Sequence, residues 1–229
     1  VAAWPLAADE PAPALAEVQQ VVAAMEKAVN AADVEGYLRH VSAVDPFFRQ
    51  EQACWADDLK KIKPETFEMK WENAAMSADG RRVNGEMTWV WRLPKAKNDR
   101  KLTFPANFIR EDGQWRFAGE VWLHVDGDRC QVLFLDEKLR KEAEGIAEVF
   151  PDIRRQVFAD FEEKEPAMMQ VKLYPRMQHL QASIFLSYVD GIAGWNEPGE
   201  AIKLLSMRQG GAGKTIRAAD LYDGSEKGD

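Results

Sequence analysis

The chain has little of what would mark a metal, nucleic-acid or membrane protein. Its only cysteines, Cys54 and Cys130, lie far apart in 229 residues, and neither has a second cysteine or a histidine at metal-ligand spacing. Acidic residues outnumber basic ones by 38 to 30, and no basic patch stands apart to bind nucleic acid. No apolar run approaches the roughly 20 residues that cross a bilayer. We therefore expect no metal site, no cofactor, no nucleic-acid partner and no membrane span.

The pattern of the two cysteines leaves their state open. They could form one disulfide, but the pattern favours two small buried apolar residues, because free cysteine is among the most buried residue types.

A glycine-rich segment near the end, Gln209–Thr215 (QGGAGKT), lacks the spacing of a phosphate-binding loop. That loop needs a glycine five positions before Gly213, and Arg208 is there instead. The residues after it are one short turn and a polar end, which cannot complete a nucleotide-binding sheet. We interpret residues 208–229 as a flexible tail that begins with the loop after an edge strand.

The beginning of the chain, residues 1–13, is rich in alanine and proline and has no initiator methionine. We interpret it as a flexible segment. It resembles the start of a mature chain from which a secretion signal has been removed, or the edge of an excised piece. Export to the periplasm or beyond is a hypothesis, and the compartment stays open.

Three helices are expected next. From Ala14 to Asn30 the apolar residues recur every three or four positions, which places them on one helical stripe. Asp33 is suited to cap a second, short helix. Asp45 and Pro46 provide the cap and first residue of a third helix, which ends before Pro64.

After Pro64 the apolar period changes to two, which predicts strands of an antiparallel sheet over residues 67–71 and 83–93. Asp112-Gly113 then lies between two extended runs, a strong signal for a two-residue hairpin turn. Such a turn fixes the register of the strands. The predicted pairs are Arg110 with Trp115, Phe108 with Phe117, Ala106 with Gly119, Phe104 with Val121, and Leu102 with Leu123.

Three helices followed by a bent antiparallel sheet that closes with "FPANFIREDGQWRFAGEVW" resemble the nuclear transport factor 2-like (SnoaL-like) family. The resemblance covers about residues 14–125. It implies a cone, also called a cystatin-like fold, in which helices and a curved sheet surround a pocket, and we assign this domain to residues 14–126. Members include enzymes, ligand binders and accessory domains, so the fold does not choose among these functions.

The inward face of the cone is expected to be aromatic. Two interpretations are open: simple core packing, or a pocket for a small apolar ligand, helped by the small Ala106 and Gly119 pair. The candidate pocket residues are Tyr37, Trp55, Trp89, Trp91, Phe104, Phe108, Arg110 and Trp115.

A catalytic group is harder to find, because Arg110 is the only charged residue expected on the inward face, and no nucleophile and base lie together in the pattern. Trp122 and His124 are expected on the outward face of the sheet, as interface residues. That face could dock the second half of the chain or a second copy of it.

The second half is expected to have the order strand, helix, strand, helix, strand, strand. The long helix spans about Glu137 to Glu163, and Pro151 is expected to kink or divide it. This order, with "VKLYP" and "GIAGWNEPGEAIKLL", resembles the N-terminal portion of a peptidase-MA-like (gluzincin) domain over residues 127–207. The H-E-x-x-H motif that would supply zinc ligands is missing from these residues. Glu197 and Glu200 are interpreted as parts of a solvated turn.

The sequence therefore predicts an α+β protein in which a cone precedes a smaller, incomplete α+β domain. The predicted function is a non-catalytic accessory, interaction or ligand-binding domain attached to the front part of a metallopeptidase-like domain that is inactive in this chain. The alternative is a small-molecule binder or SnoaL-type enzyme that uses the aromatic pocket. The ligand and the oligomeric state stay open.

Overall fold

A computed structural model of the chain describes residues 11–184, 186 and 192–207. Helices and strands are arranged around two sheets, one of four strands and one of five. The chain is thus α+β with a curved antiparallel sheet, as the sequence predicted. Of the two ends expected to be flexible, residues 1–10 and 208–229 lie outside the described part of the chain, whereas residues 11–13 are helical, which corrects the prediction for them.

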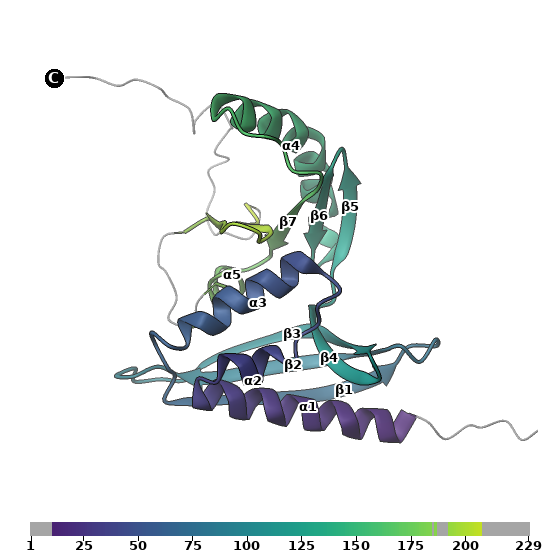
Figure 1. Ribbon diagram of the computed structural model, residues 1–229, viewed down its shortest axis with the longest axis vertical. Coiled ribbons are helices and arrows are strands. Elements are labelled where there is room, and N and C mark those ends of the chain that lie inside the picture. The colour runs from purple at the N-terminus through teal and green to yellow at the C-terminus, as the bar shows by residue number, and fades with distance from the viewer. Residues whose placement is uncertain (1–10, 185, 187–191, 208–229) are drawn as a thin grey trace, which may run out of the picture.

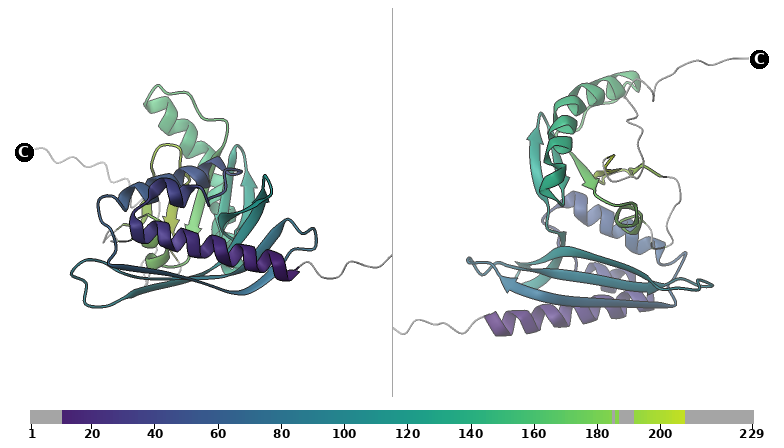
Figure 2. Two further views of the ribbon diagram at one scale, coloured as in Figure 1. Left: turned by 60° about the horizontal axis from the view of Figure 1, so that its bottom comes forward. Right: turned by 180° about the vertical axis from the view of Figure 1, so that it is seen from behind.

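The three predicted helices are present as α1 (Pro11–Ala31), α2 (Val34–Leu38) and α3 (Pro46–Asp58). The Asp33 side chain accepts a hydrogen bond from the Gly36 amide at 2.8 Å, and Asp45 caps α3 through the Phe47 amide at 2.9 Å. These caps satisfy amides that a helix leaves without partners at its start. Figure 2, left, shows α1 and α3 on the same side of the four-stranded sheet.

The antiparallel sheet runs in the order β1 (Thr66–Met76), β2 (Arg82–Arg92), β3 (Arg100–Glu111) and β4 (Gln114–Glu120). Its alternating apolar residues face the helices and form one large core. This face carries a stack of cross-strand partners, such as Phe67 opposite Trp91 and Met69 opposite Trp89.

The hairpin between β3 and β4 confirms part of the predicted register and corrects the rest. Asp112 and Gly113 both have positive φ, at 50° and 79°, and Arg110 pairs with Trp115 as predicted. Phe108 likewise pairs with Phe117. The register then shifts, because a bulge with Gly119 at φ 82° inserts one residue into β4.

The bulge makes the last three predicted pairs wrong. Ala106 pairs with Glu120, and Val121 is 38% exposed rather than inside the cone. Leu123 belongs to another strand, β5 (Leu123–Gly127), which pairs with β6 (Cys130–Phe134) in the second sheet. The antiparallel sheet of the cone therefore ends at Glu120.

The second sheet has the order β5-β6-β7-β9-β8, with β7 at Met169–Tyr174, β8 at Gly194–Trp195 and β9 at Ile202–Leu205. Strands β6, β7 and β9 are parallel, whereas the two edge strands run antiparallel to their neighbours. From β6 onward the order of elements agrees with the prediction.

A 3-10 turn, η1 (Glu137–Leu139), leads into helix α4 (Arg140–Asp160), which packs on β5 and β6. Pro151 lies inside α4, and the helix continues past it without division. Figure 1 shows α4 at the opposite end of the molecule from α1, with α3 between the two sheets. Cys54 and Cys130 are both free thiols.

Candidate functional site

The aromatic candidates of the cone lie in one buried cluster. Tyr37, Trp55 and Trp89 form a chain of rings, with centroids 5.3 Å apart for the first pair and 5.4 Å for the second. Phe104 continues the chain, 5.2 Å from Trp89. Burial is nearly complete for all four side chains, and Trp55, Trp89 and Phe104 line one small cavity, which we call the mouth of the cone.

Of the other candidates, Phe108 and Trp115 lie elsewhere in the same core and Arg110 lies on the surface. Trp115 donates its indole N–H to Glu17 of α1 at 2.9 Å, and Phe108 packs against Trp71. Arg110 is exposed at the hairpin tip, 5.8 Å from the centroid of the Trp115 ring. Trp115, Phe108 and Arg110 are not among the residues that line the cavity at the mouth.

The cone mouth is filled by a segment of the second half, helix α5 (Met177–Ala182) and the residues just after it. The indole N–H of Trp55 donates to the Ala182 carbonyl at 3.2 Å, and that of Trp91 donates to the Leu186 carbonyl at 3.0 Å. Arg100 also donates to the Leu186 carbonyl, at 3.0 Å. Ala182 and Leu186 belong to the same hydrophobic core as the cone.

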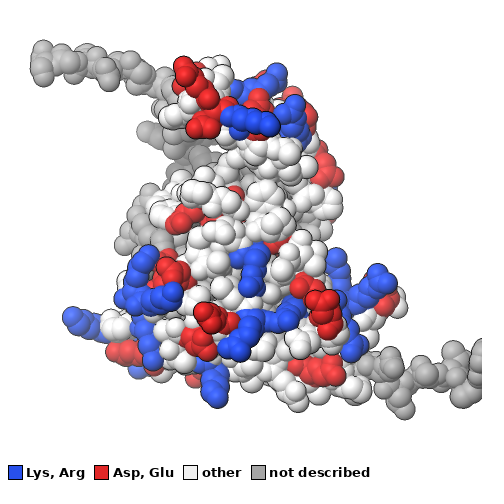
Figure 3. Space-filling model, viewed as in Figure 1, with Lys and Arg blue, Asp and Glu red and all other residues white. Residues whose placement is uncertain are grey.

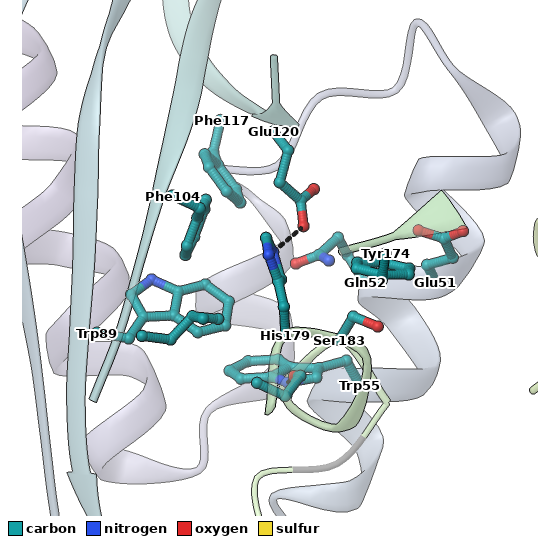
Figure 4. A pocket seen from close by; sticks show the side chains of 12 residues that line it. Glu51, Gln52, Trp55, Trp89, Phe104, Phe117, Glu120, Tyr174, His179 and Ser183 are labelled. Carbon is teal, nitrogen blue, oxygen red and sulfur yellow. Dashed lines mark hydrogen bonds and ion pairs between the residues drawn. The ribbon is translucent and has the colours of Figure 1, made fainter. Parts of the chain in front are cut away.

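Glu120 enters the mouth because of the β4 bulge. Strict alternation after Phe117 would place Gly119 inward and Glu120 outward, and the extra residue reverses this. The Glu120 carboxylate then lies 3.3 Å from Nε2 of His179 on α5. Figure 4 shows the His179 ring between the cone aromatics and Tyr174, directed at Glu120.

This pairing decides the charge of Glu120. Burial alone would raise the pKa of the Glu120 carboxyl, but the hydrogen bond and charge of His179 oppose it and, with Lys172, lower that pKa to about 2. Glu120 is therefore held as a carboxylate. An ionised acid facing an imidazole stabilises α5 in the mouth.

A second buried ion pair joins the halves nearby. Nζ of Lys172 on β7 lies 2.5 Å from Oε2 of Glu51 on α3, and both side chains are less than 5% exposed. The ammonium also lies 5.4 Å from the Trp122 ring centroid. Burial acts to lower the pKa of Lys172, but the carboxylates of Glu51 and Glu120 outweigh it and raise that pKa.

The two predicted interface residues differ in position. Trp122 lies in the connection between the two sheets and packs edge-on against Tyr174, with ring centroids 5.4 Å apart. His124 lies on β5, is more than half exposed, and contacts Asp126 at 3.7 Å. Trp122 thus contributes to the junction of the halves, whereas His124 does not.

Little free space remains between the halves. A cavity of about 20 Å³ lies among the side chains of Figure 4, which is room for a single water molecule. Within the described part of the chain, Oε1 of Glu51 and Nε1 of Trp89, two of the lining residues, have no hydrogen-bond partner. The site in this conformation is a packed, polar junction without room for a ligand.

One group of side chains could in principle hold a metal ion. Ligand atoms of Cys54, Glu197 and Glu200 lie within 4.8 Å of one another. Burial, and then the hydrogen bond to Glu200, raise the pKa of the Cys54 thiol to about 11, so it stays protonated at neutral pH. Glu200 also bonds Lys203 at 3.0 Å, so its carboxylate already has two partners and we assign no ion here.

Sequence reasoning missed the charged residues of the junction: Glu51, Glu120, Lys172 and His179. Gly119 was the available signal for Glu120, because an isolated glycine inside a strand pattern indicates a bulge. The sequence places His179 in the short helix of the second half, far from Glu120 in the chain. No pattern in the sequence joined it to Glu120.

Charge is mixed on one face of the molecule. On the face drawn in Figure 3, basic and acidic side chains are intermingled over both halves. Among the described helices, none combines the length and the apolar character needed to span a bilayer.

No protein-family model matches the chain, and no curated protein is similar to it in sequence. Solved structures are similar over about half of it. A variant of Rv3472, a protein of unknown function from Mycobacterium tuberculosis, is 21% identical over 49% of this chain and 72% of its own, with a TM-score of 0.40. An NTF2-like protein of unknown function from Shewanella oneidensis is 13% identical over 46% of this chain and 94% of its own, at 0.38.

A protein with a cystatin-like fold from Nostoc punctiforme is 14% identical over 45% of this chain and 84% of its own, with a TM-score of 0.36. The structural neighbours are thus NTF2-like and cystatin-like folds, matching about half of the chain. No comparison supports the resemblance of the second half to a peptidase-MA-like domain.

Proposed function

We propose that the cone is a non-catalytic interaction domain whose task is to hold the second half of the chain. The observation that carries this proposal is the pair of indole donors, Trp55 and Trp91, which bond the backbone carbonyls of Ala182 and Leu186. Backbone carbonyls at the end of α5 need partners when they are buried. The cone provides these partners at the position where a ligand would otherwise lie.

The buried charges support the same function. The Glu51–Lys172 ion pair joins the first half to the second, and the Glu120 carboxylate contacts the His179 ring across the same junction. A buried charge without its partner is costly, so these pairs select one arrangement of the two halves over others. The size of the cavity, about 20 Å³, also favours docking over ligand binding.

Replacing tryptophans by phenylalanine tests the docking function. W55F and W91F each remove an indole donor from the carbonyls of Ala182 and Leu186, and W71F is the matched control, because Nε1 of Trp71 has no partner in the described structure. We expect W55F to lower the free energy of unfolding by about 1–2 kcal/mol more than W71F, since the buried Ala182 carbonyl loses its indole donor. W91F should cause a smaller loss, because Arg100 still donates to the Leu186 carbonyl. Hydrogen exchange over residues 176–186 should accelerate in the same two variants.

Equal destabilisation by the three variants, with no faster exchange in α5, would contradict docking through these donors. Urea unfolding measures the first readout, and mass spectrometry of exchanged peptides measures the second.

A small-molecule binder or SnoaL-type enzyme is the second candidate. It is favoured by the free Nε1 of Trp89 and Oε1 of Glu51, which line the cavity and could bond a polar group of a ligand if α5 left the mouth. An apolar fluorescent probe such as anilinonaphthalene sulfonate should then bind W91F more strongly than the unchanged protein. Absence of binding to both proteins would count against a pocket.

We further propose that residues 127–207 are the front part of a metallopeptidase-like domain. The motifs "VKLYP" and "GIAGWNEPGEAIKLL" and the order of elements from β6 to β9 support this. These 229 residues contain no H-E-x-x-H, so we expect them to lack peptidase activity and to bind no zinc at such a motif. Reading the coding sequence beyond Asp229 tests the proposal, because a stop codon there would remove it.

A further inference from the structure

Helix α4 exposes a row of apolar side chains that no other described element covers. Val149, Ile153, Val157 and Phe161 are 52%, 54%, 44% and 74% exposed. They succeed one another at intervals of four residues, so they lie along one side of the helix. Single exposed apolar residues are common, but a contiguous row on one helix indicates a contact surface. We name these four residues the α4 stripe.

The buried side of α4 is already used for the sheet. Ala143, Ala147 and Pro151 are buried, and Arg154, also buried, bonds Glu165 at 3.0 Å. The α4 stripe therefore adds nothing to the core of the second half. It is available to a further segment that would lie beside the helix.

The chain leaves the described structure beside this helix. The Met207 amide donates to Oε1 of Glu142, in the first turn of α4, at 2.9 Å, and the Ser206 hydroxyl donates to Oε2 of the same carboxylate at 2.7 Å. The segment after Met207 thus starts at the N-terminal end of α4. From this point α4 extends over its full length toward the α4 stripe.

We propose that residues 216–222 of this chain (IRAADLY) dock on the α4 stripe. Eight residues, 208–215, separate them from Met207 and contain no large apolar side chain. In extended form these eight residues span up to about 27 Å. The middle of the α4 stripe, between Ile153 and Val157, lies only about 16–23 Å along the helix from Glu142. Residues 216–222 can therefore reach it.

Composition and charge both favour this segment as the occupant. Ile216, Leu221 and Tyr222 are the large apolar residues after Met207, and the other residues to Asp229 are polar, glycine or alanine. The α4 stripe ends among exposed acidic side chains, Asp160 and Glu162 among them. Lys214, just before the segment, and Arg217 within it carry charges opposite to those of Asp160 and Glu162. This attraction favours the C-terminal end of the α4 stripe as the docking position.

Hydrogen exchange of the full chain tests the proposal. We expect the amides of residues 216–222 to exchange roughly ten-fold more slowly than in a free peptide of that sequence. The double variant I153D/V157D should abolish this protection, and so should I216D/L221D. I62D is the matched control: Ile62 is 46% exposed on the other half, and its replacement should leave the tail unchanged. Both stripe residues are exposed, so their replacement should not unfold the protein.

Three results would overturn the proposal. Free-peptide exchange rates at 216–222 in the unchanged protein would show that the segment does not dock. Slow exchange that survives I153D/V157D would place it on another surface. Slow exchange that becomes more pronounced with protein concentration, together with a dimer mass by light scattering, would mean that a second copy of the chain supplies the contact.

Discussion

The two halves of the molecule cover their apolar surfaces differently. In the described part of the first half, the large exposed apolar residues are three scattered ones, Val44, Ile62 and Val121, and a single core extends from α1 to the residues after α5. The described part of the second half has six such residues, and four of them lie in a row along α4 and its C-cap. The second half contributes α5 to the core of the first half and keeps a separate core under α4. The comparison shows that α5 and the residues after it complete the hydrophobic core of the cone.

The largest effect should come from removing the cation that joins the halves. In K172A, the Glu51 carboxylate would remain buried without a counter-ion, so we expect the free energy of unfolding to fall by about 3–5 kcal/mol. Urea unfolding measures it. K61A is the matched control, because the Lys61–Asp58 pair is on the surface, and it should cause no measurable change. If K172A and K61A behave alike, the junction is not held by this pair.

Acid should loosen the junction through Glu120. The pKa of Glu120 in the folded protein, about 2, lies below the ordinary 4.5, so the stabilisation is complete above pH 4.5 and is lost as the pH falls from 4.5 to 2. A difference of this size corresponds to about 3 kcal/mol. Unfolding measured across this range should show a shallower loss for E120Q than for the unchanged protein. Parallel pH profiles for the two proteins would show that Glu120 is not responsible.

A smaller effect is expected at the β4 bulge. In G119A, alanine would adopt a positive φ, and its Cβ would lie 2.6 Å from the Phe48 ring, so we expect a loss of about 2 kcal/mol. G145A is the control, because Gly145 lies in α4 with open space around it and alanine there should add about 0.5–1 kcal/mol. Thermal or urea unfolding of both variants checks the difference. Two changes of the same sign would refute the structural role of the bulge.

The sequence predicted best what is decided locally. The caps at Asp33 and Asp45 and the turn at Asp112-Gly113 were predicted correctly, because a side chain and its near neighbours determine them. The predicted pairing of β3 with β4 is wrong beyond Phe117, because one extra residue moves every later side chain to the opposite face of the sheet.

What could not be predicted depends on contacts between distant segments. Lys172 comes directly after an apolar residue in β7, and only the parallel sheet, covered on both faces, makes its side chain buried. The aromatic candidates were predicted to line the inside of the cone, but nothing in their spacing indicated α5 as the occupant. Likewise, nothing in the sequence of the long helix indicated that Ile153, Val157 and Phe161 would be exposed.

The hydrogen bond from Trp55 to Ala182 joins residues 127 positions apart in the chain. During synthesis the cone emerges first, and the Ala182 carbonyl that accepts from Trp55 is absent until α5 leaves the ribosome. A nascent chain that ends before α5 would expose the aromatic residues of the cone mouth to the cytosol or to a translocation channel. The core of the first domain is thus completed only after the second half has been synthesised as far as α5. Premature termination would leave an aggregation-prone product.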